Sequence, residues 1–163
     1  MLWAAIASVI MVGLTVIIHY EVLRRTYDWL PRLTIPPRQR IVVVLFAVFF
    51  AHTVEVWLYG LAFYILANMS GLDVGHFGGE FHGRFPEYVY FSTVSYTSLG
   101  LGDVWPLGPM RLLTGVEALN GLVLIGWSVT FTFIAMRRFW EAHPPRKPQL
   151  RSTPETRRTD EDV

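Results

Sequence analysis

Long apolar runs alternate with short polar segments along this chain of 163 residues. Residues 2–18 carry no charged side chain, and residues 41–66 and 112–136 are apolar except for a few positions. A helix rises about 1.5 Å per residue and needs roughly 20 residues to cross about 30 Å of hydrocarbon. The pattern therefore predicts an all-α membrane protein with three transmembrane helices.

The first run is the shortest, so a signal peptide is the alternative to a membrane helix. A signal peptide has a basic start and small residues at its cleavage site. The first run has neither feature. We therefore expect it to be retained as a helix in the membrane.

The segment between the second and third runs has a pattern of its own. Residues 68–85 are glycine-rich and predict a loop, whereas Pro86 and Glu87 suit the start of a short helix. Proline fits the first helical position, and an acid stabilises the positive end of the helix dipole. A half-length helix and a Gly-x-Gly-Asp loop between two spans predict a re-entrant segment, buried in protein or lining water.

The loop after this short helix reads Thr97, Ser98, Leu99, Gly100, Leu101, Gly102, Asp103. A dehydrated cation needs a ring of oxygens, and backbone carbonyls supply it if successive residues alternate in handedness. Glycine adopts a positive φ without steric penalty, and Gly100 and Gly102 occupy alternate positions. The expected ligands of a potassium ion are the carbonyls of Ser98, Leu99, Gly100 and Leu101, with the Ser98 hydroxyl. One chain supplies one strand of such a ring, so several copies must meet.

The order of span, short helix, T-S-L-G-L-G-D and span resembles the pore module of the two-helix potassium channel family, whose motif is T-T-V-G-Y-G-D. Thr97, Gly100, Gly102 and Asp103 are identical to that motif. The resemblance implies a homotetramer with potassium ions as permeant ligands and no cofactor. The expected organisation is an extra transmembrane helix over 1–20, a basic cytoplasmic linker over 21–40, and a pore domain over 41–136, followed by a disordered cytoplasmic tail over 137–163. Within the pore domain we expect an outer helix over 41–67, an outer loop over 68–85, a pore helix over 86–97, the filter over 98–103 and an inner helix over 110–136.

Two positions depart from the family motif. Leu101 replaces a tyrosine whose hydroxyl bonds to aromatic residues of the pore helix, and Tyr90 and Phe91 stand at the matching positions. A weakly selective sodium and potassium channel is therefore the alternative to a potassium-selective one. Val94 stands where some members have an acid that pairs with the filter aspartate, so Asp103 needs another partner or remains hydrated.

Polar residues within the second and third runs are further candidates. Four residues of the third run share one helix face: Gly121, Ile125, Ser128 and Thr132. They either line the cavity below the filter or pack against other helices. The resemblance implies that Gly121 is a hinge. His52 and Glu55 share a face at membrane depth, where ionisable groups are costly. They predict either a proton- or metal-responsive gate facing Glu117 or Asn120, or an interhelical hydrogen bond.

In the outer loop, metal binding and a solvated turret are alternatives for four residues: Asp73, His76, Glu80 and His82.

Composition supports the membrane assignment, since 52% of the residues are apolar, 17% are charged and the mean hydropathy is +0.36. Soluble domains usually carry about 25% charged residues. With 14 basic and 13 acidic residues no nucleic-acid partner is indicated, and the absence of cysteine excludes disulfides and thiolate metal sites. Basic residues gather in 20–40 and 137–163, which predicts a cytoplasmic C-terminus, an outer N-terminus, and residence in the plasma or inner membrane.

We therefore expect a channel for monovalent cations and no catalysis. An intramembrane metal-dependent enzyme using His52, Glu55 and Glu117 is a more distant alternative. A non-conducting membrane subunit is another, but it leaves the Gly-x-Gly-Asp loop unexplained.

Overall fold

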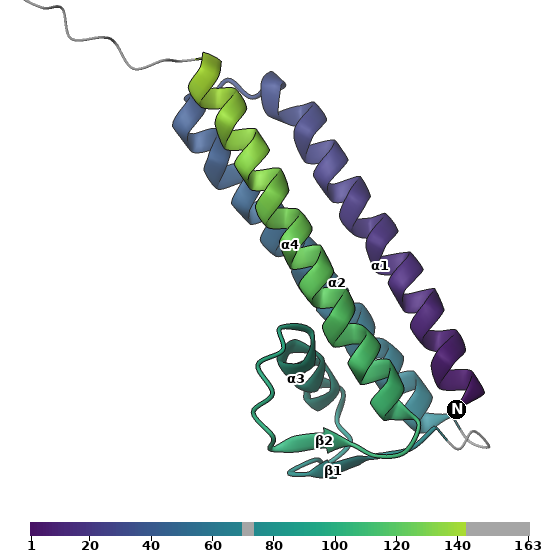
Figure 1. The fold of residues 1–163 in the computed structure, drawn as a ribbon. Coiled ribbons are helices and arrows are strands. Elements are labelled where there is room, and N and C mark those ends of the chain that lie inside the picture. Colours follow the sequence, from purple (N-terminus) through teal and green to yellow (C-terminus); the bar gives the residue numbers. More distant parts are fainter. Residues whose placement is uncertain (70–73, 143–163) are drawn as a thin grey trace, which may run out of the picture.

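The computed structural model describes residues 1–69 and 74–142. Three long helices lie along one another, and a short helix with two short strands covers one end of the bundle (Figure 1). The elements are α1 (Leu2–Trp29), the 3-10 turn η1 (Leu30–Arg32), α2 (Pro37–Asn68), β1 (Phe77–Gly79), α3 (Phe85–Tyr96), β2 (Val104–Pro106) and α4 (Met110–Ala142). The N-terminus lies at the end that carries α3 and the strands, whereas η1 and the end of α4 lie at the opposite end (Figure 1).

Within the described residues, three segments are long and apolar enough to cross a membrane: Leu2–Arg32, Gln39–Asn68 and Met110–Arg138. Many of their large apolar side chains are exposed, including Phe46 and Phe49 on α2 and Val129 on α4. Such helices must place these side chains in lipid or against other protein. The prediction of an all-α membrane protein is confirmed.

The first part of the predicted linker over 21–40 is helical, because α1 continues without a break to Trp29. Glu21 forms ion pairs with Arg24 and Arg25 on the next turn, which supports the helix beyond the apolar run. The chain then turns through η1, and Pro37 begins α2. Beyond the third predicted run α4 continues to Ala142, and the rest of the predicted tail, 143–163, lies outside the described residues.

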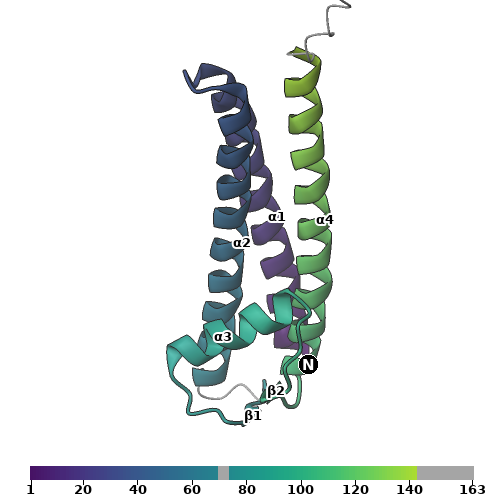
Figure 2. The same cartoon turned by 90° about the vertical axis from the view of Figure 1, so that its left-hand side faces the viewer.

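The expected outer loop contains a strand that ties together the two segments flanking the pore helix. Strand β1 pairs antiparallel with β2, with Phe77 opposite Pro106 and Gly79 opposite Val104. Glu80 extends the pairing, since its amide donates to the Asp103 carbonyl at 3.1 Å. Figure 2 shows α3 crossing one end of the bundle beside these strands. The loop after α3 is thus anchored at both of its ends.

Aromatic side chains fill the space between α2, α3 and β1. Phe91 of α3 stacks edge-to-face with Phe63 of α2 and Phe77 of β1, at centroid separations of 5.3 and 4.7 Å. Gly60 lets α2 approach α3 closely, because a Cβ there would lie 2.9 Å from the Cα of Val89. This packing fixes α3 against α2.

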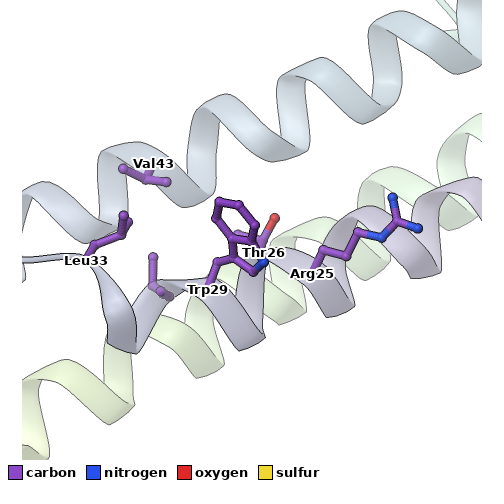
Figure 3. A pocket seen from close by; sticks show the side chains of 6 residues that line it. Arg25, Thr26, Trp29, Leu33 and Val43 are labelled. Carbon is purple, nitrogen blue, oxygen red and sulfur yellow. The ribbon is translucent and has the colours of Figure 1, made fainter.

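A shallow groove of about 270 Å³ lies at the opposite end, between the end of α1 and the start of α2. Figure 3 shows Trp29 and Leu33 on one side of it and Val43 on the other, with Arg25 along the rim. Its lining is almost entirely apolar. None of the candidate functional residues identified from the sequence lines this groove.

Candidate ion-conduction site and the polar cluster behind it

The backbone after α3 alternates in handedness. Ser98, Gly100 and Gly102 have positive φ values of 57°, 59° and 81°, and Ser98 is the one non-glycine residue with positive φ in the described part of the chain. Because the residues between them have negative φ, successive carbonyls can be brought toward one side of the strand. The sequence indicated this alternation at the two glycines but not at Ser98.

The amide groups of this segment are held by the end of the pore helix. Ser98 donates to the carbonyl of Ser95 and Leu99 to that of Val94, both at 2.9 Å. Within the described residues no hydrogen bond ends on the carbonyl oxygens of residues 98–101. These four oxygens remain available to a ligand.

Residues 97–103 are all exposed in the single chain, although both flanking elements are packed. Leu99 and Leu101 are 63% and 60% exposed. Two leucines and a row of carbonyls without partners are an unfavourable surface for an isolated protomer at membrane depth. The segment has the character of a surface that other copies of the chain cover.

Asp103 has a partner that the sequence did not identify. The Tyr90 hydroxyl, one turn into the pore helix, donates to Asp103 Oδ2 at 2.6 Å. This hydrogen bond lowers the pKa of Asp103 and raises the pKa of the Tyr90 phenol. In the sequence, Tyr90 stands at a pore-helix position that is aromatic in the potassium channel family. Its hydroxyl was the feature that could have suggested a hydrogen bond to Asp103.

Glu87 takes part in capping the start of the pore helix. Its carboxylate accepts hydrogen bonds from the His82 amide at 2.7 Å and from the Arg84 side chain at 3.0 Å. Desolvation raises the pKa of Glu87, but these hydrogen bonds outweigh it and lower the pKa to about 2. Glu87, the acidic residue that the sequence predicted at the start of this helix, therefore also binds the end of the outer loop through His82 and Arg84.

The structure divides the four residues of the predicted stripe between the two alternatives, lining a hollow and packing against other helices. A Cβ at Gly121 would lie 2.2 Å from the Tyr96 carbonyl oxygen, so Gly121 is where α4 packs on the pore helix. Ser128 is 4% exposed and faces other helices of the same chain. Ile125 and Thr132 are half-buried, and together with Ser128 they line a groove between α2 and α4. Sequence spacing identified the shared face but not which neighbour it meets.

His52 and Glu55 belong to a buried polar cluster that also includes residues of α1 and α4. His19 Nδ1 lies 2.8 Å from Glu55 Oε1, and His52 Nδ1 lies 3.1 Å from Glu55 Oε2. The other ring nitrogen, Nε2, of each histidine lies 3.0 Å from the Ser128 hydroxyl. The Tyr96 hydroxyl donates to Glu55 as well. The cluster therefore joins all three long helices to the pore helix.

Four of these contacts close a ring that runs through Glu55, His19, Ser128 and His52. Each hydrogen bond needs one hydrogen atom, and the Ser128 hydroxyl supplies one of the four. Glu55 and the two imidazoles take part in the remaining bonds, so every member of the ring has polar partners. A buried polar group that is hydrogen-bonded is much less costly than one without partners.

Neither Glu117 nor Asn120 is the partner of His52 or Glu55, so that prediction is wrong. Glu117 is fully buried and accepts a hydrogen bond from Ser92 of the pore helix. Asn120 donates to the hydroxyls of Thr15 on α1 and Tyr59 on α2, at 2.8 and 3.2 Å. The interhelical hydrogen bond that the sequence offered as an alternative for His52 and Glu55 is the arrangement found, with His19 and Ser128 as added members.

The outer-loop residues do not form a metal site where the structure describes them. His82 lies near Glu87, with 3.4 Å between Nδ1 and Oε1, and Asp73 lies outside the described residues. Among described residues, one group of three potential metal ligands is close enough together: His19, His52 and Glu55. The metal-dependent enzyme considered from the sequence required Glu117, which is not in that group.

Comparison with known proteins agrees with this geometry. The family model described as "Ion channel" matches residues 40–138, more than half of the chain. The match begins in α2 and ends near the end of α4, so it contains the re-entrant segment and leaves α1 outside. Comparison with curated proteins and with solved structures finds no match. The family consists of channels and not of enzymes, and this chain is an integral membrane protein that belongs to the ion channel family.

Proposed function

We propose that the chain forms a homotetrameric channel for monovalent cations, with potassium as the favoured ion. Residues 97–103 form the filter, and potassium ions are the permeant ligands of the carbonyls of residues 98–101. The observation that carries the proposal is the alternation of positive φ at Ser98, Gly100 and Gly102. A backbone of this handedness can turn successive carbonyl oxygens toward one axis, as the selectivity filters of potassium channels require.

The exposed surface of the single chain supports assembly around such an axis. The filter segment is exposed, as are Leu122, Val129 and Phe133 on α4. In a tetramer these residues would meet other copies or line the conduction path. The N-terminus lies at the filter end of the bundle (Figure 1), which agrees with an outer N-terminus and a cytoplasmic C-terminus in the plasma or inner membrane.

A weakly selective cation channel is the second candidate, and Leu101 favours it. The Leu101 side chain has no hydroxyl with which to bond to the pore helix, so it cannot fasten the filter at a fixed width in that way. Reversal potentials separate the two candidates. In mixed potassium and sodium, a potassium-selective channel reverses near the potassium equilibrium potential, and a weakly selective one reverses between the two.

The test of the proposal is cation flux in liposomes that contain the full chain. A potassium gradient should drive a barium-sensitive flux, and Gly100→Ala should reduce it about tenfold or more, because an L-residue at φ 59° costs about 1–2 kcal/mol in each of four strands. Gly13→Ala is the matched control, since Gly13 also has open space around its Cβ position but lies in helix α1. A monomeric protein, or equal flux in both variants, would contradict the proposal.

A further inference from the structure

The ring nitrogens of His19 and His52 converge on one carboxylate at the junction of α1 and α2. Their Nδ1 atoms lie 2.8 and 3.1 Å from the two oxygens of Glu55. One ligand atom from each residue can be chosen so that all three lie within 4.8 Å of one another. His19 and Glu55 are fully buried, and the His52 side chain is 19% exposed. We propose that these three side chains bind one transition-metal ion of the Zn²⁺ class and so fasten α1 to the pore domain.

The donor set and its spacing suit this class of ion. Two imidazole nitrogens and one carboxylate oxygen are ligands that Zn²⁺ prefers, at about 2.0–2.2 Å from the metal. Tetrahedral angles at those bond lengths place neighbouring ligand atoms roughly 3.3 Å apart. Each ring nitrogen lies slightly closer than this to a different oxygen of Glu55, His19 Nδ1 to Oε1 and His52 Nδ1 to Oε2. A small outward movement of the side chains therefore admits an ion between the two imidazoles and the carboxylate.

Ser128 already provides the outer support that such a site needs. A histidine that binds a metal through one ring nitrogen usually donates the other N–H to an oxygen, which fixes the ring. The Nε2 atoms of His19 and His52 both lie 3.0 Å from the Ser128 hydroxyl oxygen. That oxygen has two lone pairs and can accept from both rings when their Nδ1 atoms bind the ion.

An ion can reach the site along a groove between α2 and α4. The groove has a volume of about 450 Å³, and both His52 and Ser128 are among the residues that line it. Figure 2 shows α1 behind the space between these two helices. His52 is therefore the ligand on the approach side, and His19 and Glu55 form the closed side.

The test measures Zn²⁺ and Co²⁺ binding to the full chain in detergent, after removal of any histidine tag. We expect one ion per chain and a Co²⁺ visible spectrum of tetrahedral type. His19→Gln, His52→Gln and Glu55→Gln should each weaken binding more than about 100-fold, and Ser128→Ala, which removes a positioning residue only, about 10- to 100-fold. The matched control is His82→Gln, which changes an exposed outer-loop histidine and should leave binding unchanged. The chain contains no cysteine to compete for the ion.

A second measurement does not depend on any variant folding. X-ray absorption of the Zn²⁺-loaded wild-type protein should show two imidazole ligands and no more. Absence of stoichiometric binding, a shell without two imidazoles, or an equal loss of affinity in His82→Gln would each overturn the proposal. None of these results bears on cation flux, so the metal site and the channel are tested separately.

Discussion

Single residues set the chemistry at the two ends of the re-entrant segment. Asp103 is held by the Tyr90 hydroxyl, and Glu87 is held by the backbone and side chain just before the pore helix. In both cases hydrogen bonds favour the ionised carboxylate. The charge of Glu87 is paired with Arg84, whereas Asp103 keeps a negative charge beside the re-entrant loop, which raises the local concentration of cations.

Tyr90→Phe tests the charge at Asp103. The hydrogen bond lowers the pKa of Asp103, so its contribution is present at neutral pH and is lost as the pH falls through the lowered value. Without the hydroxyl this pKa rises, and the carboxylate is neutralised at a higher pH. We expect cation flux to decline at a higher outer pH in Tyr90→Phe than in the wild type, measured as flux against pH in liposomes.

Tyr64→Phe is the control for that experiment, because it removes a phenol hydroxyl from α2 without touching Asp103. Its acid response should match that of the wild type. If Tyr90→Phe and the wild type lose flux at the same pH, the hydrogen bond does not control the charge at Asp103.

At the scale of helices, the sequence predicted which segments cross the membrane but not how they face one another. Apolar runs and a Gly-x-Gly-Asp loop are local signals, and they identified the three spans and the re-entrant segment. The contact between His19 and Glu55 spans 36 positions and depends on the rotation of α1 and α2 about their axes, which no local pattern determines. For the same reason the sequence left both cavity lining and helix packing open for Gly121, which in the structure packs on the pore helix.

Gly121→Ala tests the contact between α4 and the pore helix. A Cβ at this position would lie 2.2 Å from the backbone oxygen of Tyr96, which has little room to move. Overpacking of this kind costs about 1–3 kcal/mol. We expect a lower unfolding midpoint in detergent, followed by circular dichroism.

Gly115→Ala is the matched control on the same helix, because a Cβ there meets nothing within 4 Å. It should leave the midpoint unchanged or raise it, since alanine favours a helix over glycine by about 0.5–1 kcal/mol. Equal midpoints for the two variants would mean that α4 can move away from the pore helix at no cost.

For the whole molecule, α1 is part of the packed structure although it lies outside the channel family match. His19 bonds to Glu55 of α2, and Thr15 accepts from Asn120 of α4. Arg138 of α4 also donates to the Tyr27 hydroxyl of α1. Polar contacts thus follow α1 along its length. Removing α1 would leave Glu55 with His52 and Tyr96, and Asn120 with Tyr59, as remaining partners. Both buried groups would lose one hydrogen bond and their cover from lipid, which is costly at membrane depth.

The last prediction concerns a chain that lacks residues 1–35. We expect it not to accumulate as folded, membrane-inserted protein, because Glu55 loses the His19 partner at 2.8 Å and Asn120 loses Thr15. A separate fragment of residues 1–35, produced in the same cells, should dock on the same polar groups and restore the folded protein, measured by size-exclusion chromatography. The fragment with His19→Leu should restore less, since it covers the same surface but lacks the His19 hydrogen bond to the Glu55 carboxylate. Folding of the shortened chain by itself, with unchanged flux, would show that α1 is an accessory helix and that Glu55 finds another partner.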